Sequence, residues 1–338
     1  MPPHPHRPPE LAWQVFRGSE AIRRGLLSRH HLRGSSWIRL RQDVYADARL
    51  DRDHALACRA ALLRMPPGAA IAGPSAAYLH GVEHAAGFTD DVHVLLPATV
   101  RADSQPGVRV HHAPMSSTRS GLLVPVGSAA PARTSPPVGQ RSPAGSSPPA
   151  DTRTPGAVMN LAGPPPRTEP AACAWETAVW ADPVEAVGIV DGLLRTGSVN
   201  RSALASEAAR NACRPGGRRA AWVFGLTDGL AQSPPESHLR VRLVLAGLPR
   251  PVAQYPVRVS TGLILHPDLA WPEFRVAVEY DGQWHSDADR MHLDRRRLNQ
   301  LVAAGWLVLH VTGRRLRKEF PTLVREIRAA LVARGWRP

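Results

Sequence analysis

The stretch VAVEYDGQWHSDADR, residues 276–290, decides the fold. It opens with alternating apolar residues and then places two acids, a glycine and a histidine in quick succession. On a strand, residues two apart share a face, so Glu279 and Asp281 point the same way. Val278 and Tyr280 share the other face. The pattern therefore predicts a half-buried strand whose end carries two carboxylates.

The segments around this strand predict a mixed sheet with helices packed on it. A Pro-Pro start and a closing glycine predict a helix over 233–247. The expected order after it is two strands flanking a Thr261-Gly262 turn, the central strand, a helix over 287–305, a strand over 306–312, and mainly helix to the C-terminus. Because a strand that follows a helix favours a parallel crossover, the fold class is α/β (α+β) with a mixed sheet.

Acidic residues gather around the central strand. If the preceding hairpin turns at 273–274, Asp268 lies directly across from Glu279. With Asp281 this gives three carboxylates in a small volume, the ligand set that Mg²⁺ or Mn²⁺ requires. A divalent ion there would neutralise a phosphate and lower the pKa of an attacking water. His285 follows Asp281 by four residues and is a candidate general base or acid.

Several of these pieces, in this order, resemble the very-short-patch-repair-like (Vsr-like) branch of the PD-(D/E)XK nuclease superfamily. The resemblance spans about 233–318 and rests on Glu236, DLAWP from Asp268, VAVEYDGQWH (276–285) and LDRRRLNQLVAAGW (293–306). It implies a restriction-endonuclease-like fold that cleaves DNA.

The resemblance also implies a role for each acid. Asp268 and Glu279 would be metal ligands, Glu236 a supporting acid, Asp281 a further acid and His285 the catalytic or water-activating side chain. The sequence departs from the superfamily at one place, because the lysine expected two residues beyond Glu279 is Asp281. The Vsr-like branch has an altered core of this kind in which histidine takes part.

The N-terminal part predicts a winged helix. Residues 19–50 read as a short helix, a second helix around Ser28–Leu32 and an alternating β-wing. Together with SAAYLHG and VHVLLP further on, they resemble the AbiEi-type antitoxin region. Asp43 stands where that family has glycine before Val-Tyr. The resemblance implies DNA binding, with operator DNA or a cognate toxin as candidate partners.

Composition changes along the chain predict six segments. Gly127–Pro170 is rich in proline and small polar residues, and it cannot bury enough apolar surface to fold. The expected organisation is a disordered lead (1–18), a winged-helix region (19–50), a small α/β region (51–126), a disordered insertion (127–170), a helical connector (171–232) and the nuclease-like domain (233–338).

Charge and cysteine content bound the partners and the compartment. The net charge of +14 favours a polyanionic partner, although a single lysine among 42 basic residues suggests a compositional bias. Residues 236–338 carry 17 basic and 10 acidic residues, half of that net charge. The candidate DNA-contacting residues are Arg290, Arg295, Arg296, Arg297, Arg314, Arg315, Arg317 and Lys318. Three separated cysteines and no apolar span or signal peptide predict a cytoplasmic protein.

Four alternatives stay open at this point. Asp-Gly is common turn chemistry, so Glu279 and Asp281 could form a solvated strand end. The arginine run could be the wet face of a helix that buries Leu298 and Leu301. A DNA-binding regulator of the antitoxin kind, with a nuclease fold that has lost turnover, fits the missing lysine, and an RNA-processing enzyme would share the same site.

Overall fold

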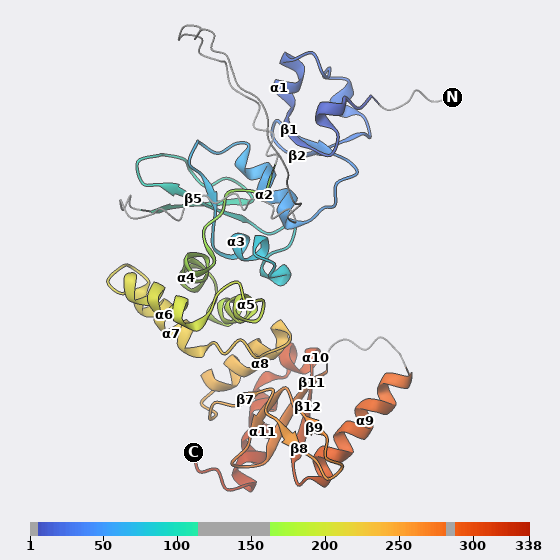
Figure 1. The fold of residues 1–338 in the computed structure, drawn as a ribbon, viewed down its shortest axis with the longest axis vertical. Coiled ribbons are helices and arrows are strands. Elements are labelled where there is room, and N and C mark those ends of the chain that lie inside the picture. Colours follow the sequence, from blue (N-terminus) through green and yellow to red (C-terminus); the bar gives the residue numbers. More distant parts are fainter. Residues whose placement is uncertain (1–5, 114–162, 282–287) are drawn as a thin grey trace, which may run out of the picture. The chain divides into compact units, whose positions relative to one another are not determined.

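The computed structural model describes residues 6–113, 163–281 and 288–338, with the side chains of 288–295 left out. The chain forms two compact units, Met1–Ile71 with Phe88–Arg167, and Ala72–Gly87 with Thr168–Pro338. Helices and mixed sheets occur in both (Figure 1), so the predicted α/β (α+β) class is confirmed. None of the helices described is long and apolar enough to cross a membrane.

The first unit contains two small sheets. One has the order β1-β3-β2 and is antiparallel; the other has the order β4-β5-β6, with β5 and β6 parallel. The elements are β1 (Val15–Arg17), α1 (Gly18–Arg23), β2 (Trp37–Arg41), β3 (Val44–Asp47), α2 (His54–Leu62), β4 (Ala70–Ile71), β5 (Val92–Pro97) and β6 (Val108–Ala113). The predicted β-wing is the β2–β3 hairpin.

Two N-terminal predictions are wrong in detail. The expected disordered lead is ordered from residue 6, because Leu11 and Phe16 are buried in one core with Trp37. These apolar residues lie among prolines and charges, which hid them in the composition. The expected second helix of the winged region is only a 3-10 turn, His31–Arg33. Residues 1–5 lie outside the described part of the chain.

The conformation and hydrogen bonds of Asp43 explain how aspartate can stand where the antitoxin-like pattern has glycine. Its φ is +60°, in the left-handed region that favours glycine, at the turn between β2 and β3. Its carboxylate accepts hydrogen bonds from the Ser19 amide (2.7 Å), the Ser19 hydroxyl (2.6 Å) and Arg17 Nε (3.0 Å). Aspartate tolerates this conformation better than most residues, and these bonds offset the remaining strain.

The second unit begins with a layer of helices. Its members are α3 (Gly73–Leu79), α4 (Pro170–Trp180), α5 (Pro183–Arg195), α6 (Arg201–Arg210) and α7 (Gly217–Leu226). The short α3 lies against α4, where the Gly73 amide donates to Glu176 (2.9 Å) and a Cβ at Gly73 would come within 2.7 Å of the Trp180 ring. The prediction that 51–126 forms one α/β region is therefore wrong at 72–87.

The boundary of the proline-rich insertion also needs correction. Residues 163–170 are described and partly ordered: Ile71 and Arg167 form a β-bridge, Thr168 is buried, and α4 begins at Pro170. Proline is compatible with the first turn of a helix, so the proline-rich composition of this stretch concealed the start of α4. The rest of the predicted insertion, 127–162, lies outside the described residues.

The C-terminal part is a four-stranded mixed sheet of order β12-β11-β10-β7. Its strands are β7 (Val252–Ala253), β10 (Leu269–Trp271), β11 (Val276–Asp281) and β12 (Leu307–Thr312), with a separate hairpin of β8 (Val257–Arg258) and β9 (Ile264–Leu265). β11 and β12 are parallel and are connected through α9 (Ala288–Ala303), as predicted.

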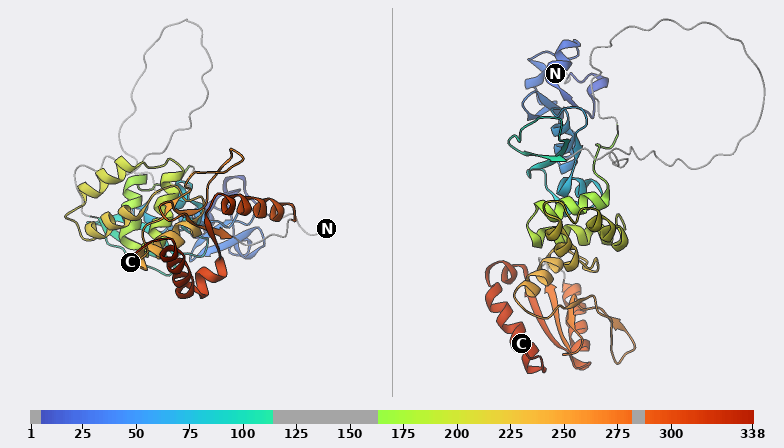
Figure 2. Two further views of the ribbon diagram at one scale, coloured as in Figure 1. Left: turned by 90° about the horizontal axis from the view of Figure 1, so that it is seen from below. Right: turned by 90° about the vertical axis from the view of Figure 1, so that its left-hand side faces the viewer.

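Helices cover both faces of this sheet, as seen in Figures 1 and 2. On one face Val276 and Val278 pack with α8 (Pro234–Leu245), α10 (Gly313–Lys318) and α11 (Phe320–Ala333). On the other face Ala277 packs with Leu301 of α9. The alternation predicted for β11 is confirmed by these two cores.

Helix α8 belongs to two cores at once. Leu239 and Leu243 pack under the sheet, while Val241 packs with α4, α5 and α7. Arg240, 1% exposed, pairs with Asp191 at 2.7 Å and with Asp228 at 2.8 Å. The predicted connector (171–232) is therefore continuous with the C-terminal part and does not form a separate segment.

Candidate active site

The acids meet at the end of the hairpin β10–β11. Leu269 pairs with Val278 in an antiparallel register, so the next position along puts Asp268 opposite Glu279. The register predicted from a turn at 273–274 is confirmed. Glu279 lies on the α9 side of the sheet, two residues beyond Ala277.

Asp268 is held by two donors and is otherwise crowded by like charge. The Tyr280 amide donates to its Oδ2 at 2.8 Å, and the Gln254 side-chain amide donates to its Oδ1 at 3.2 Å. Burial and, second, the neighbouring Glu236 charge raise the pKa of Asp268 to about 6, against the opposing effect of its two donors and of Arg297. The carboxylate form is therefore costly here unless a positive group is added.

Glu236 approaches from the first turn of α8 and is 7% exposed. Ser233 Oγ donates to its Oε1 at 2.7 Å, and the Gln232 amide donates to its Oε2 at 2.8 Å. This is close to the capping-box arrangement, which ties the helix start to its own side chain. Glu236 thus has a structural role in addition to its electrostatic effect on Asp268.

Gln254 bridges two of the acids and was missed in the sequence. Its Nε2 lies 3.4 Å from Glu236 Oε2 and 3.2 Å from Asp268 Oδ1. Its φ is +52°, and its backbone amide donates to the Asp268 carbonyl at 3.1 Å. No local sequence pattern marks a left-handed glutamine, so only the fold reveals this contact.

Glu279 is the most perturbed acid of the site. Burial and, second, the Asp268 charge raise its pKa to about 7, while Arg297 and a backbone hydrogen bond from Asp268 oppose the rise. Arg297 Nη2 lies 3.2 Å from Glu279 Oε1 as an ion pair. Even so, Glu279 Oε1 is buried without a hydrogen-bond partner, because the ion pair lacks hydrogen-bond alignment. A buried carboxylate oxygen in this state is expected at functional sites.

Asp281 pairs with a second residue that the sequence reasoning missed. Glu279 is the register partner of His310 on the parallel strand β12, which puts His310 on the same face as both acids. His310 Nδ1 lies 3.2 Å from Asp281 Oδ2. A lone histidine in the apolar run WLVLHVT, once that strand is expected to lie parallel to β11, is the signal that could have found it.

The remaining predicted site residues divide into three groups. His285 lies outside the described residues, as do the side chains of Arg290 and Arg295. Arg315 is engaged, donating to the His310 carbonyl at 3.2 Å and to Glu326 at 2.5 Å. The exposed members of the predicted DNA-contacting set are Arg296, Arg314, Arg317 and Lys318. Helix α10 starts directly after β12, whose last residue pairs with Asp281 at the end of β11. Arg314, Arg317 and Lys318 therefore come directly after the end of the sheet that carries Glu279 and Asp281.

The acids offer a divalent cation a partial site. Across the residues with described side chains, no group of three His, Cys, Asp or Glu is placed to hold a metal ion. The donor chemistry of Asp268 and Glu279 nevertheless suits a hard cation, because both are partly buried carboxylates with raised pKa and Glu279 Oε1 lacks a hydrogen-bond donor. The residues that would hold it are Asp268 and Glu279, with Asp281 two residues further on.

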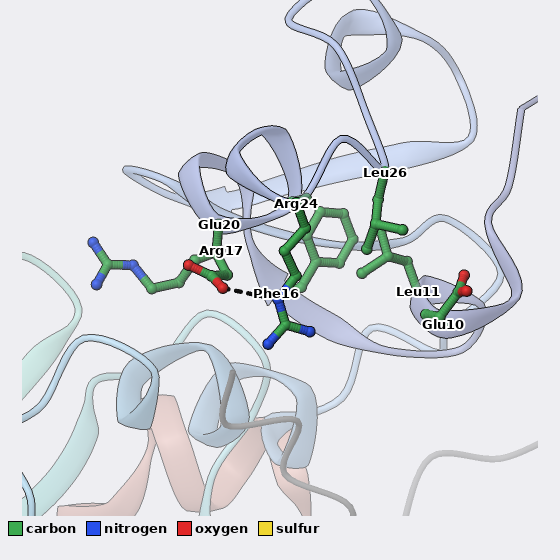
Figure 3. Close-up of a pocket in the computed structure, with 8 residues that line it drawn as sticks. Glu10, Leu11, Phe16, Arg17, Glu20, Arg24 and Leu26 are labelled. Atoms are coloured by element: carbon green, nitrogen blue, oxygen red, sulfur yellow. Dashed lines mark hydrogen bonds and ion pairs between the residues drawn. The ribbon is translucent and has the colours of Figure 1, made fainter. Parts of the chain in front are cut away.

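A separate small pocket in the first unit lies over its core (Figure 3). Phe16, Leu11 and Leu26 line its apolar side, and Glu20 pairs with Arg24 at 2.9 Å on its polar side. Its volume of about 20 Å³ suffices for about one water molecule. The pocket is therefore too small for a nucleotide or a substrate of similar size.

Comparison with known proteins adds similarity but no function. The chain is 32% identical over 153 residues to an uncharacterized protein of Mycobacterium tuberculosis strain CDC 1551 / Oshkosh and, to the same extent, to one of strain H37Rv. The match covers 45% of this chain and 56% of each relative, so the chain spans little more than half the length of these relatives. No family model and no solved structure matches the chain.

Proposed function

We propose that the chain is a metal-dependent endonuclease of the Vsr-like kind that hydrolyses phosphodiester bonds in DNA. The observation that carries the proposal is the pair Asp268 and Glu279, facing each other on adjacent strands with raised pKa values. Perturbed carboxyls of this kind cluster at functional sites. The resemblance of the motifs around them to nucleases gives the pair its chemical interpretation.

The chain's own residues have distinct tasks in this proposal. Asp268 and Glu279 hold a Mg²⁺ or Mn²⁺ ion, which when bound neutralises phosphate charge and acidifies a water molecule. Gln254, which also bonds Glu236, fixes Asp268 in place. His310 is hydrogen-bonded to Asp281 and lies on the same face of the sheet as Glu279, where it is the candidate general base or acid among the described residues. The exposed cations Arg296, Arg314, Arg317 and Lys318 hold the DNA backbone.

A second candidate is a DNA-binding regulator without turnover, in the manner of an AbiEi-type antitoxin. The ion pair of Arg297 with Glu279 favours it, since Glu279 already has a positive neighbour. The β2–β3 hairpin of the first unit would supply duplex contacts in either case. In this candidate the partners are operator DNA and a cognate toxin.

Cleavage of supercoiled plasmid, single strands and mismatched duplexes separates the two. With Mg²⁺ or Mn²⁺ we expect nicking that EDTA abolishes and that Glu279→Ala lowers at least about 100-fold, the effect of removing a principal electrostatic group. Glu185→Ala, at an exposed acid on α5, is the matched acid control and keeps the activity. Tight DNA binding without metal-dependent cutting in the parent protein would establish the regulator instead.

A further inference from the structure

Two unsatisfied polar atoms of opposite kind lie next to each other in the site. Glu279 Oε1 is a buried acceptor without a donor, and Arg297 Nε is a buried donor without an acceptor. Both belong to one ion pair, with Arg297 Nη2 3.2 Å from Glu279 Oε1. Burying such groups unpaired costs free energy, and native structures leave few of them without a reason.

Arg297 differs from an ordinary surface arginine in how it is held. Its side chain is 40% exposed, yet Nε is shielded, and Nη2 also donates to the His266 carbonyl. His266 lies two residues before Asp268, so the guanidinium is fixed against the segment that leads into β10 and carries Asp268. Its neighbour Arg296, by contrast, points to solvent. The position of Arg297 is therefore set by the site, which a solvated helix face would not require.

The two unpaired atoms, Glu279 Oε1 and Arg297 Nε, indicate which ligand could pair with both. A free carboxylate oxygen seeks a cation, whereas a free guanidinium N–H seeks an anionic oxygen. Guanidinium groups match phosphate oxygens through their fork of donors better than lysine does. A metal-bound phosphate supplies both partners within one ligand.

We propose that Arg297 is the phosphate-binding residue of the active site, taking an oxygen of the scissile phosphodiester through its Nε–H. In the absence of a ligand its guanidinium is ion-paired with Glu279. With cation and phosphate bound, the Glu279 carboxylate would contact the cation and the Arg297 N–H groups would donate to the phosphate. The inference rests on the proposed nuclease function, and it assigns to Arg297 a specific phosphate contact where the sequence predicted only a general DNA-facing surface.

The test compares Arg297→Gln with Arg297→Lys and with Arg325→Gln. Arg325 is exposed on α11, across the sheet from the site, so it controls for the loss of one charge. Mn²⁺ binding is measured by calorimetry without DNA, and binding of a short duplex is measured by fluorescence anisotropy in Ca²⁺. Circular dichroism and thermal unfolding establish that each variant is folded.

We expect Arg297→Gln to bind Mn²⁺ as tightly as the parent or several-fold more tightly, because a competing positive charge has gone. Duplex binding in Ca²⁺ should weaken by about tenfold or more, the equivalent of losing one charge-assisted contact. Arg297→Lys should recover part of this loss, since it keeps the charge but not the fork. Arg325→Gln should change both affinities less than about twofold.

Two results would overturn the inference. Loss of Mn²⁺ binding in folded Arg297→Gln would make the arginine a structural support of Glu279, and unchanged duplex binding would remove its phosphate role. Failure of the nuclease proposal looks different. If the parent binds Mn²⁺ and duplex, depends on Arg297 for the duplex and cuts nothing, the nuclease proposal is wrong while the phosphate role of Arg297 stands.

Discussion

Two buried acidic clusters border α8, and they differ in how well their oxygens are satisfied. Asp191 Oδ1 accepts the amides of Asp228 and Gly229, at 2.8 and 2.9 Å, and its Oδ2 accepts from Ser237 Oγ and Arg240, both at 2.7 Å. Glu279, at the sheet edge, has an oxygen with no donor and a pKa near 7.

The difference separates a structural acid from a candidate functional one. A carboxylate with a full set of donors stabilises the fold and gains nothing from a ligand. A carboxylate left short of donors costs stability and gains most when a cation arrives. Burial alone would not distinguish the two clusters, since Asp191 is 2% exposed and the Glu279 side chain 15%.

Removing the cation of the satisfied cluster should have the largest effect. Arg240→Met leaves Asp191 and Asp228 buried without their counterion, which typically costs about 3–5 kcal/mol of unfolding free energy. Urea denaturation followed by tryptophan fluorescence measures it, with the exposed Arg325→Met as control. A loss near that of the control would mean that Asp191 is no better satisfied than Glu279, and the contrast would fail.

Neutralising the unsatisfied acid should do the opposite. The pKa of Glu279 is raised from its usual 4.5 to about 7, so its contribution to stability is fully present below about pH 4.5 and lost as pH rises through 7. Glu279→Gln should therefore stabilise the metal-free protein at pH 8 by about 2 kcal/mol and have little effect at pH 4.5. The check is urea denaturation at both pH values in EDTA.

This prediction has a clear contrary outcome. Destabilisation by Glu279→Gln at pH 8 would show that the ion pair with Arg297 outweighs burial and the Asp268 charge. Glu279 would then belong with Asp191 as a structural acid.

The smallest effect is expected at the bridge between Glu236 and Asp268. Gln254→Leu removes the amide that donates to both carboxylates and should cost about 1 kcal/mol at pH 8. The loss should shrink at pH 5, below the pKa of about 6 of Asp268, where that acid is protonated. Urea denaturation at the two pH values tests this, and an equal loss at both would assign Gln254 to backbone support through its φ of +52°.

The sheet and the acid pair were predictable from local patterns. Alternation predicted the faces of β11, and a turn assumed at 273–274, midway between Asp268 and Glu279, predicted their register. The parallel partner of β11 followed from the intervening helix. Each of these inferences used only neighbours along one hairpin or one crossover.

The contacts that complete the site were not predictable in this way. Gln254, Arg297 and His310 reach the acids from a short edge strand, a helix and the parallel strand. Their roles depend on side-chain direction and on a left-handed backbone, which have no signature in hydrophobic periodicity. For the same reason the sequence treated Arg297 and Arg296 alike, although the fold separates them.

The assignment of α3 to the second unit has a consequence for how the chain is made. During synthesis α3 leaves the ribosome before α4, against which it packs and which begins about 90 residues later. At a translation rate of about 5–20 residues per second, Ala76 and Ala77, which are buried in the folded protein, stay without the packing of α4 for several seconds. The first unit is thus able to fold before α8 to α11 have emerged, whereas the second, which contains Asp268 and Glu279, is completed only after α11 has emerged.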